Sequence, residues 1–238
     1  MTDLDGRVIA VAGAAGGLGP TAARALAEAG ATLALTDVDQ GRLDALAGEL
    51  DLADERLDAG VVDLLDEGAA RGWCAALSER FGRVDSLLHL VGGWRGGESL
   101  AETPLSDYEW LHDLLVRTVQ HTTRAFFEAL SASEHGRFVL VSSSQAQAPS
   151  ATNASYAAAK AAAEAWTLAL ADSFREAESA ATANVLVVNA ILTPQMRAEN
   201  PDKPFRTFTS AEDIAAALVF LCSDEAGKMN GKRLPLHP

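Results

Sequence analysis

The sequence predicts a single-domain α/β protein of the Rossmann type, with a doubly wound parallel sheet and helices on both faces. Continuously apolar runs alternate with helix-like segments along the chain, as they do when helices cover both faces of a parallel sheet. The chain has 238 residues, a length that one large α/β domain can take up. No internal repeat, charge block or Pro/Ser linker interrupts the alternation, so we expect residues 1–238 to form one domain.

Each expected strand is a short aliphatic run. The runs are VIAVAG (8–13), TLALTD (32–37), SLLHLVG (86–92), RFVLVSS (137–143) and NVLVVNA (184–190). The helix-like segments lie at about 20–30, 40–50, 66–80, 106–130, 153–177 and 211–223. Residues 193–210 break this rhythm, with three prolines and no clear period. A loop of this length beyond a strand end predicts a substrate lid, the alternative being a disordered excursion.

The composition narrows the class of partner. Hydrophobic residues make up 48% and charged residues 22% of a chain with net charge −14, so a globular protein that binds neither nucleic acid nor membrane surfaces is expected. The start, MTDLDGR, does not resemble a signal or transit peptide, and the alanine-rich stretch 157–171 contains Lys160 and Glu164. We therefore expect a cytoplasmic protein without a metal site, in which Cys74 and Cys222 are reduced core residues.

A glycine cluster follows the first strand directly. Between that strand and the next helix stand Gly13, Gly16, Gly17, Leu18 and Gly19. Glycines let the backbone turn sharply and approach a pyrophosphate, and a helix N-terminus directs free N–H groups at the anion. Tight turns use glycine as well, but in this strand, loop and helix context the cluster predicts a dinucleotide-binding loop.

The second strand ends in Asp37. A carboxylate at this place accepts hydrogen bonds from the adenosine ribose hydroxyls and repels a 2′-phosphate. Because no arginine or lysine lies in 13–19 or beside Asp37, we expect NAD, with NADP less favoured. The alternative is an aspartate that caps the following helix. Asp63 is a second candidate, either at the adenine edge or as a turn residue.

Tyr156 and Lys160 are four residues apart in a helix-like segment, which places them on one face. A tyrosine with a pKa of about 10 is a poor acid–base catalyst at neutral pH, and a nearby ammonium lowers that pKa. Ser143 stands at the end of its strand, where the hydroxyl can bind a substrate oxygen. Tyr–Lys pairs of this spacing also occur by chance, but beside the glycine loop they predict an acid–base site.

These motifs together resemble the short-chain dehydrogenase/reductase family over nearly the whole chain. The match consists of the glycine loop, Asp37, Asp63, Ser143, Tyr156, Lys160 and the VNA of 188–190. The resemblance implies a Rossmann-type fold, a nicotinamide cofactor and hydride transfer to or from a carbonyl or carbinol carbon. It implies that Tyr156 is the general acid/base, that Ser143 holds the carbonyl oxygen, and that Lys160 lowers the Tyr156 pKa and binds the nicotinamide ribose. By the same resemblance, Gly92 and Thr193 contact the cofactor.

Four positions depart from the family pattern. Ala12 replaces the usual threonine, and His89-Leu90-Val91-Gly92 replaces Asn-Asn-Ala-Gly. Leu115 stands where the family has the asparagine that holds a proton-relay water, unless Thr118 or Gln120 takes that place. The Pro-Gly turn after the strand 184–190 is missing. These departures motivate a further alternative, a non-catalytic dinucleotide-binding sensor or scaffold.

The segment 92–97, GGWRGG, resembles the corresponding segment of dihydropteridine reductases, an NADH-using branch of the family. Trp94 could stack on a flat heterocycle and Arg95 could offer a charge at the rim. Trp94, Arg95 and Gln145 are therefore the candidate substrate contacts, and an NADH-dependent dihydropteridine-reductase-like enzyme is the alternative to a general NAD(H)-dependent oxidoreductase of carbonyls or alcohols. The family also implies a homodimer or homotetramer formed through the helices 106–130 and 153–177.

Overall fold

The structure, a computed structural model, describes residues 3–236, so the predicted domain 1–238 extends two residues beyond it at each end. Seven strands form one parallel sheet in the order β3-β2-β1-β4-β5-β6-β9. They are β1 (Val8–Ala12), β2 (Thr32–Asp37), β3 (Leu57–Val61), β4 (Ser86–His89), β5 (Arg137–Ser143), β6 (Thr182–Val188) and β9 (Arg233–Pro235).

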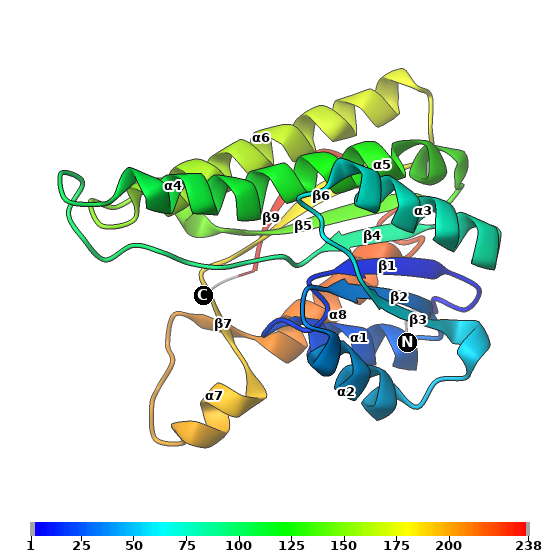
Figure 1. The fold of residues 1–238 in the computed structure, drawn as a ribbon, viewed down its shortest axis with the longest axis horizontal. Helices are drawn as coiled ribbons and strands as arrows, with labels where there is room; N and C mark the ends of the chain where they lie inside the picture. The colour runs from blue at the N-terminus through cyan, green and yellow to red at the C-terminus, as the bar shows by residue number, and fades with distance from the viewer. Residues whose placement is uncertain (1–2, 237–238) are drawn as a thin grey trace.

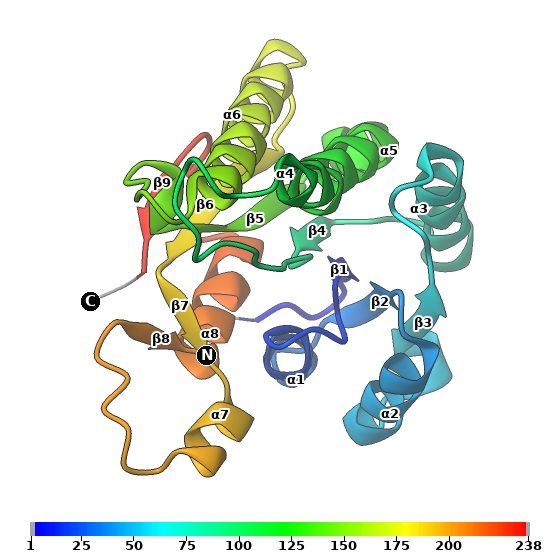
Figure 2. The same cartoon turned by 60° about the vertical axis from the view of Figure 1, so that its left-hand side comes forward.

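Helices cover both faces of this sheet (Figures 1 and 2). One face carries α1 (Gly19–Glu28), α2 (Gln40–Leu50) and α8 (Ala211–Cys222), and the other carries α3 (Glu67–Phe81), α5 (Thr118–Ala132) and α6 (Ala154–Glu176). The sequence of β1 is apolar throughout because both of its faces are covered. Ile9 and Val11 pack toward α1 and α8, whereas Ala10 and Ala12 pack toward α3 and α5. The predicted doubly wound α/β architecture is confirmed.

The strand order reverses between β1 and β4, which are neighbours in the sheet although β2 and β3 separate them in sequence. In open α/β sheets, ligands bind beyond the carboxyl ends of the strands at such a reversal. The chain after β1 and the chain after β4 both leave the sheet here, and the Leu90 N–H donates to the Ala12 carbonyl (2.8 Å). The fold thus opens a site between the ends of β1 and β4.

The segment 106–130 is not one continuous α-helix, contrary to the sequence prediction. It consists of α4 (Leu105–His112), a π-helical turn (Asp113–Arg117) and α5. In the π-helical turn, the Thr118 N–H bonds to the Asp113 carbonyl, and the Thr118 hydroxyl donates to the Leu114 carbonyl (2.6 Å). A π-helical turn inserts into an otherwise helical pattern without breaking it, so hydrophobic periodicity alone does not reveal it.

The predicted lid segment 193–210 contains regular structure at both ends. It holds the helix α7 (Pro194–Glu199) and the strand β8 (Phe208–Ser210), which pairs in parallel with β7 (Ala190–Leu192). The Thr193 hydroxyl caps α7 by accepting the Met196 N–H (3.1 Å). Elements this short carry no readable period, which explains why the sequence predicts only a loop. Figure 1 shows α7 and the chain leading to β8 extending away from the sheet.

Candidate active site

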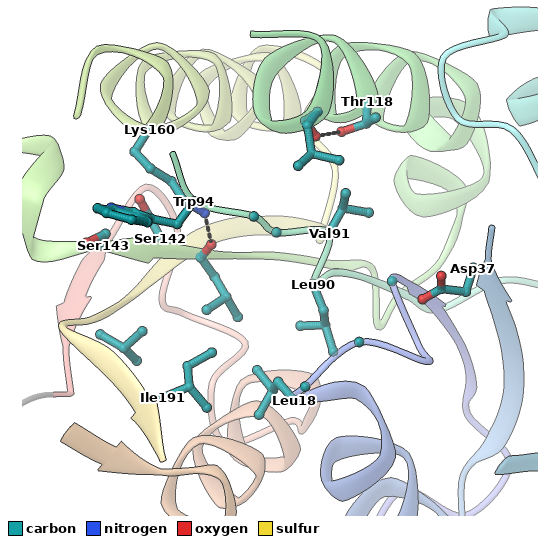
Figure 3. Close-up of a pocket in the computed structure, with 18 of the residues that line it drawn as sticks. Leu18, Asp37, Leu90, Val91, Trp94, Thr118, Ser142, Ser143, Lys160 and Ile191 are labelled. Atoms are coloured by element: carbon teal, nitrogen blue, oxygen red, sulfur yellow. Dashed lines mark hydrogen bonds between the residues drawn. The ribbon is translucent and has the colours of Figure 1, made fainter. Parts of the chain in front are cut away.

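A cavity of about 740 Å³ lies at the carboxyl ends of the central strands (Figure 3). The residues predicted from the sequence that line this cavity are Gly13, Gly16, Gly17, Leu18, Asp37, Asp63, Gly92, Trp94, Ser143, Gln145, Tyr156, Lys160 and Thr193. Two other predicted residues, Gly19 and Arg95, do not line it. The glycine loop and the Ser–Tyr–Lys set therefore meet in one space of the size that proteins use to bind small molecules and cofactors.

The glycines of the loop have different reasons to be glycine. Gly13 has a φ of +82°, and a Cβ there would lie 2.7 Å from the Val91 nitrogen. A Cβ on Gly19 would lie 2.0 Å from the Ala14 carbonyl oxygen. Both positions are required by the packing of the loop itself. Gly17 lines the cavity, and a Cβ there would meet no atom closer than 3.5 Å, so its missing side chain leaves the wall of the cavity open.

The two predicted aspartates are held by backbone N–H groups. The Asp37 carboxylate accepts from Ala15 in the glycine loop (2.9 Å) and from Val38 (2.8 Å). The bond from Ala15 ties the end of β2 to the glycine loop. The Asp63 carboxylate accepts from the Leu65 N–H (2.9 Å). Both carboxylates line the cavity, so they combine a turn-stabilising role with access to a ligand.

An arginine that sequence reasoning missed also reaches this cavity. Arg42 lies in the first turn of α2 and lines the cavity together with Asp37. Its side chain is 70% exposed, and its Nε lies 3.8 Å from the Asp39 carboxylate. The glycine loop and the neighbours of Asp37 contain no cation, whereas the start of α2 brings one from five positions further along the chain.

The Ser143, Tyr156 and Lys160 side chains come from β5 and α6. The Ser143 hydroxyl accepts the Gln145 N–H (3.2 Å), so its own proton is available to another acceptor. The Lys160 ammonium donates to the Val141 carbonyl (3.0 Å), a bond drawn in Figure 3. Its Nζ lies 5.9 Å from the centre of the Tyr156 ring. One turn of α6 thus places a phenol and an amine above the end of β5.

Burial dominates the protonation of this pair. It lowers the pKa of Lys160 to about 8, while the Glu164 carboxylate one helical turn away opposes that fall. Burial also raises the pKa of Tyr156, and the neighbouring Ser143 hydroxyl opposes that rise. The net shift of the Tyr156 pKa in this structure is therefore upward, because desolvation of the phenolate outweighs stabilisation by its surroundings.

Leu115 and His89, two of the positions that depart from the family pattern, are both buried. Leu115 is 2% exposed and belongs to an apolar cluster against which Tyr156 packs. Thr118 lines the cavity, but its hydroxyl is committed to the Leu114 carbonyl. His89 is fully buried and, among the described residues, neither ring nitrogen has a hydrogen-bond partner.

Of the three candidate substrate contacts, Trp94 and Gln145 line the cavity and Arg95 does not. Trp94 is 57% exposed and lines the cavity. Arg95 instead donates to Asp107 (3.0 Å), and its guanidinium carbon lies 4.1 Å from the centre of the Trp110 ring. The structure therefore places Arg95 outside the cavity, because an ion pair and a cation–π contact hold it on α4. Gln145 lines the cavity, with its side-chain oxygen bonded to the Asn153 amide.

Other chemistry has less support in the described residues. Over residues 3–236, no three His, Cys, Asp or Glu side chains form a group that could hold a metal ion. Both cysteines are free and buried, and burial raises the pKa of each thiol, that of Cys222 to about 12. Within the same range, no helix is both long and apolar enough to cross a membrane.

Comparison with known proteins agrees with this geometry. A family model described as enoyl-(acyl carrier protein) reductase matches residues 13–236. The chain is 28% identical to (2S)-[(R)-hydroxy(phenyl)methyl]succinyl-CoA dehydrogenase subunit BbsD of Thauera aromatica, over 97% of this chain and 95% of that protein. A short-chain dehydrogenase/reductase from Brucella melitensis superposes with a TM-score of 0.84 at 27% identity, covering 99% of this chain and 97% of that one. A gluconate 5-dehydrogenase from Burkholderia cenocepacia, solved with NADP and tartrate, gives 0.85 at 26% identity, covering 98% and 94%.

Proposed function

The chain belongs to the short-chain dehydrogenase/reductase family of oxidoreductases, and from this premise we propose that it is an NAD(H)-dependent enzyme that interconverts a carbonyl and an alcohol. The observation that carries the proposal is that Ser143, Tyr156 and Lys160 line the same cavity as the glycine loop. A cavity with a phosphate-binding loop at one part and an acid–base pair at another suits hydride transfer better than binding alone.

The residues present fit a dinucleotide. The wall left open at Gly17 and the N-terminus of α1, which begins at Gly19, suit a pyrophosphate. Asp37 suits ribose hydroxyls and supports NAD over NADP. Arg42 is the counter-argument, since an arginine near this place accommodates a 2′-phosphate in other proteins, and the gluconate 5-dehydrogenase relative was solved with NADP. We propose NAD because the Asp37 carboxylate is fixed by two backbone bonds, whereas Arg42 is exposed.

The mechanism assigns one task to each side chain. Bound nicotinamide supplies or accepts the hydride. The Ser143 hydroxyl, which accepts the Gln145 N–H, donates a hydrogen bond to the substrate oxygen and keeps its own proton. Tyr156 gives a proton to that oxygen in reduction and removes it in oxidation. Lys160, held by the Val141 carbonyl, keeps a positive charge beside the phenol. The raised pKa of Tyr156 favours the protonated phenol, the form that reduction needs.

The substrate is proposed to enter past Trp94 and the segment 193–210, which we propose acts as a lid. The exposed Trp94 ring at the cavity also favours a second candidate, reduction of a flat pterin-like heterocycle with NADH, since the ring can stack on such a substrate.

We further propose a cytoplasmic homodimer or homotetramer. A groove of about 410 Å³ lies on the outer side of α5 and α6, and Phe127 and Trp166 are among its lining residues. The apolar residues of this groove, Phe127, Trp166, Ala169 and Leu170, support pairing with a second copy. Light scattering on the purified protein tests the assembly.

A titration of NADH and NADPH by fluorescence, combined with turnover of a panel of carbonyl compounds, tests the function. Wild type and Tyr156→Phe are both expected to bind NADH in preference to NADPH, and only wild type is expected to turn over. Asp37→Ser is expected to lose the preference for NADH. Binding of NADH without turnover of any carbonyl by wild type would favour a sensor or scaffold, and failure to bind either dinucleotide would overturn the proposal.

A further inference from the structure

Three consecutive residues at the end of β5 are held from behind by side chains of α6 and β9. The Val141 carbonyl accepts from Lys160 (3.0 Å). The Ser142 hydroxyl donates to the Glu164 carboxylate (2.6 Å). The Ser143 carbonyl accepts from the Arg233 guanidinium (3.5 Å). The strand end that carries the Ser143 hydroxyl is therefore fixed at every residue.

Glu164 is at the centre of this arrangement. Its side chain is 7% exposed, and while one carboxylate oxygen accepts from Ser142, the other accepts from the Arg233 Nε (2.8 Å). Both oxygens of a buried carboxylate are thus satisfied, by a strand of the central sheet and by the C-terminal strand. Such a buried ion pair contributes little net stability compared with apolar residues of the same volume. Its location directly behind the site suggests a functional reason for retaining it.

We propose that Glu164 is a positioning residue of the active site, which fixes the end of β5 through Ser142 and Arg233 and sets a buried negative charge one helical turn from Lys160. The proposal rests on the proposed function only for its effect on turnover. Tyr156, Lys160 and Glu164 are spaced four residues apart on α6, so they share one face of the helix. The C-terminal strand β9 contributes to the site through Arg233, which does not line the cavity itself.

The negative charge of Glu164 stabilises the buried ammonium of Lys160. Burial lowers the pKa of Lys160, and Glu164 opposes that fall, so that the pKa lies at about 8. Removing the carboxylate should therefore lower the Lys160 pKa further below about 8 and leave more neutral amine at neutral pH.

The other ionisable groups near α6 are neutral, exposed or bonded to other partners. From the sheet, His89 faces Lys160, and burial lowers its pKa to about 3, so it is neutral at neutral pH. The strand β6 and the turn Ser144–Ala146 carry no ionisable side chain. On α4 and the π-helical turn, Asp107 pairs with Arg95, Asp113 lies beside His112 and Arg117, and Tyr108 and Glu109 are exposed. On α5, His121 bonds to the Leu64 carbonyl, Arg124 pairs with Glu67, and Glu128 is exposed. On β5, Arg137 donates to the Gly136 carbonyl.

The test measures the protonation of Lys160 without any substrate. Acetic anhydride acylates an amine only in its neutral form, so trace labelling from about pH 6 to about pH 10, read by mass spectrometry of the Lys160 peptide, gives the midpoint of the Lys160 titration. Glu164→Gln keeps the shape of the side chain and can keep both hydrogen bonds, but it removes the charge. We expect the midpoint to fall, and a fall of about one unit would increase labelling at pH 7 about fivefold.

Three variants separate charge from general damage. Arg233→Met leaves the Glu164 carboxylate in place, so the Lys160 midpoint in this variant should not fall. Ser142→Ala removes one hydrogen bond but no charge, so its midpoint should stay near wild type. Glu176→Gln removes an exposed glutamate from the same helix and should change nothing. An unchanged midpoint in Glu164→Gln, or an equal fall in Arg233→Met, would overturn the proposal.

Kinetics then tests the positioning role. With a substrate that wild type turns over, Glu164→Gln should lower kcat at least about tenfold with a smaller change in KM, and should move the pH profile of kcat in the same direction as the labelling midpoint. A loss of kcat with an unmoved pH profile would contradict the role of the charge. If wild type turns over no substrate, the proposed function fails, whereas the labelling result still decides the effect of Glu164 on Lys160.

Discussion

His89 provides a quantitative test of the buried polar layer below the cavity. It ends β4, is 0% exposed, and has no hydrogen-bond partner on either ring nitrogen among the described residues. Burial and the nearby Lys160 ammonium lower its pKa from 6.5 to about 3. The folded protein therefore keeps this imidazole neutral at pH values where the unfolded chain protonates it.

This difference makes stability depend on pH. Between pH 6.5 and about 3, the unfolded state binds a proton that the folded state does not, so the free energy of unfolding falls as the pH falls. Linkage with these two values gives a loss of about 2 kcal/mol between pH 7 and pH 5, and of about 5 kcal/mol once the pH is below the folded value. The loss at pH 5 is a large fraction of the stability of an ordinary domain.

Urea unfolding followed by circular dichroism at pH 5 and at pH 7 measures the effect. His89→Leu removes the titrating group and fills a similar volume, so it should lose about 2 kcal/mol less than wild type over this interval. It should also be at least as stable as wild type at pH 7, because an unbonded polar ring is replaced by an apolar side chain. His121→Gln, which removes a half-buried histidine of α5, is the control. Equal pH dependence in His89→Leu and wild type would refute the reasoning.

Three further predictions test the site. Gly17→Ala adds a methyl to the cavity wall and should weaken NADH binding about tenfold without lowering the thermal midpoint. Gly19→Ala should instead lower the thermal midpoint, since its Cβ would lie 2.0 Å from a carbonyl oxygen. Calorimetric titration measures the binding, and melting curves measure the midpoint. Trp94→Ala should raise KM about threefold to tenfold in steady-state kinetics, with less effect on kcat, because a stacking surface is lost. Wild type should gain stability as the pH rises from about 8 to 10.5, where the buried ammonium of Lys160 loses its proton. Lys160→Met should lack this gain in urea unfolding and should lose turnover.

The sequence predicts β1, β2, β4, β5 and β6 well because these strands are buried on both faces, whereas the more exposed strands β3 and β9 lie outside the predicted apolar runs. The predicted bounds 32–37 and 137–143 equal those of β2 and β5, since apolar residues fill these strands and polar residues end them. The π-helical turn between α4 and α5 is not predictable in this way, because it changes the hydrogen-bond pattern without changing the residue type. The six-residue helix α7 and the three-residue strand β8 are too short for any period.

The site is predictable where its residues stand at strand ends or one helical turn apart. It is not predictable where contacts join distant parts of the chain. Arg42 and Thr118 reach the cavity from helices whose orientation the sequence does not give. Glu164 and Arg233 are 69 residues apart and meet only because β9 pairs with β6. The rise in the Tyr156 pKa is likewise a property of burial, which the spacing of tyrosine and lysine does not report.

The strands nevertheless contain a signal of the site that does not depend on any family motif. On the face toward α5 and α6, Leu87 is followed two residues later by His89, and Leu140 by Ser142. A period of two places each polar side chain in line with an apolar one, inside a core. A buried polar group costs free energy unless it is bonded, and both interruptions occur at the cavity end of neighbouring strands, where α6 supplies Glu164 to Ser142. On this face of the sheet, the end at which apolar alternation fails in β4 and β5 is therefore the end that borders the cavity.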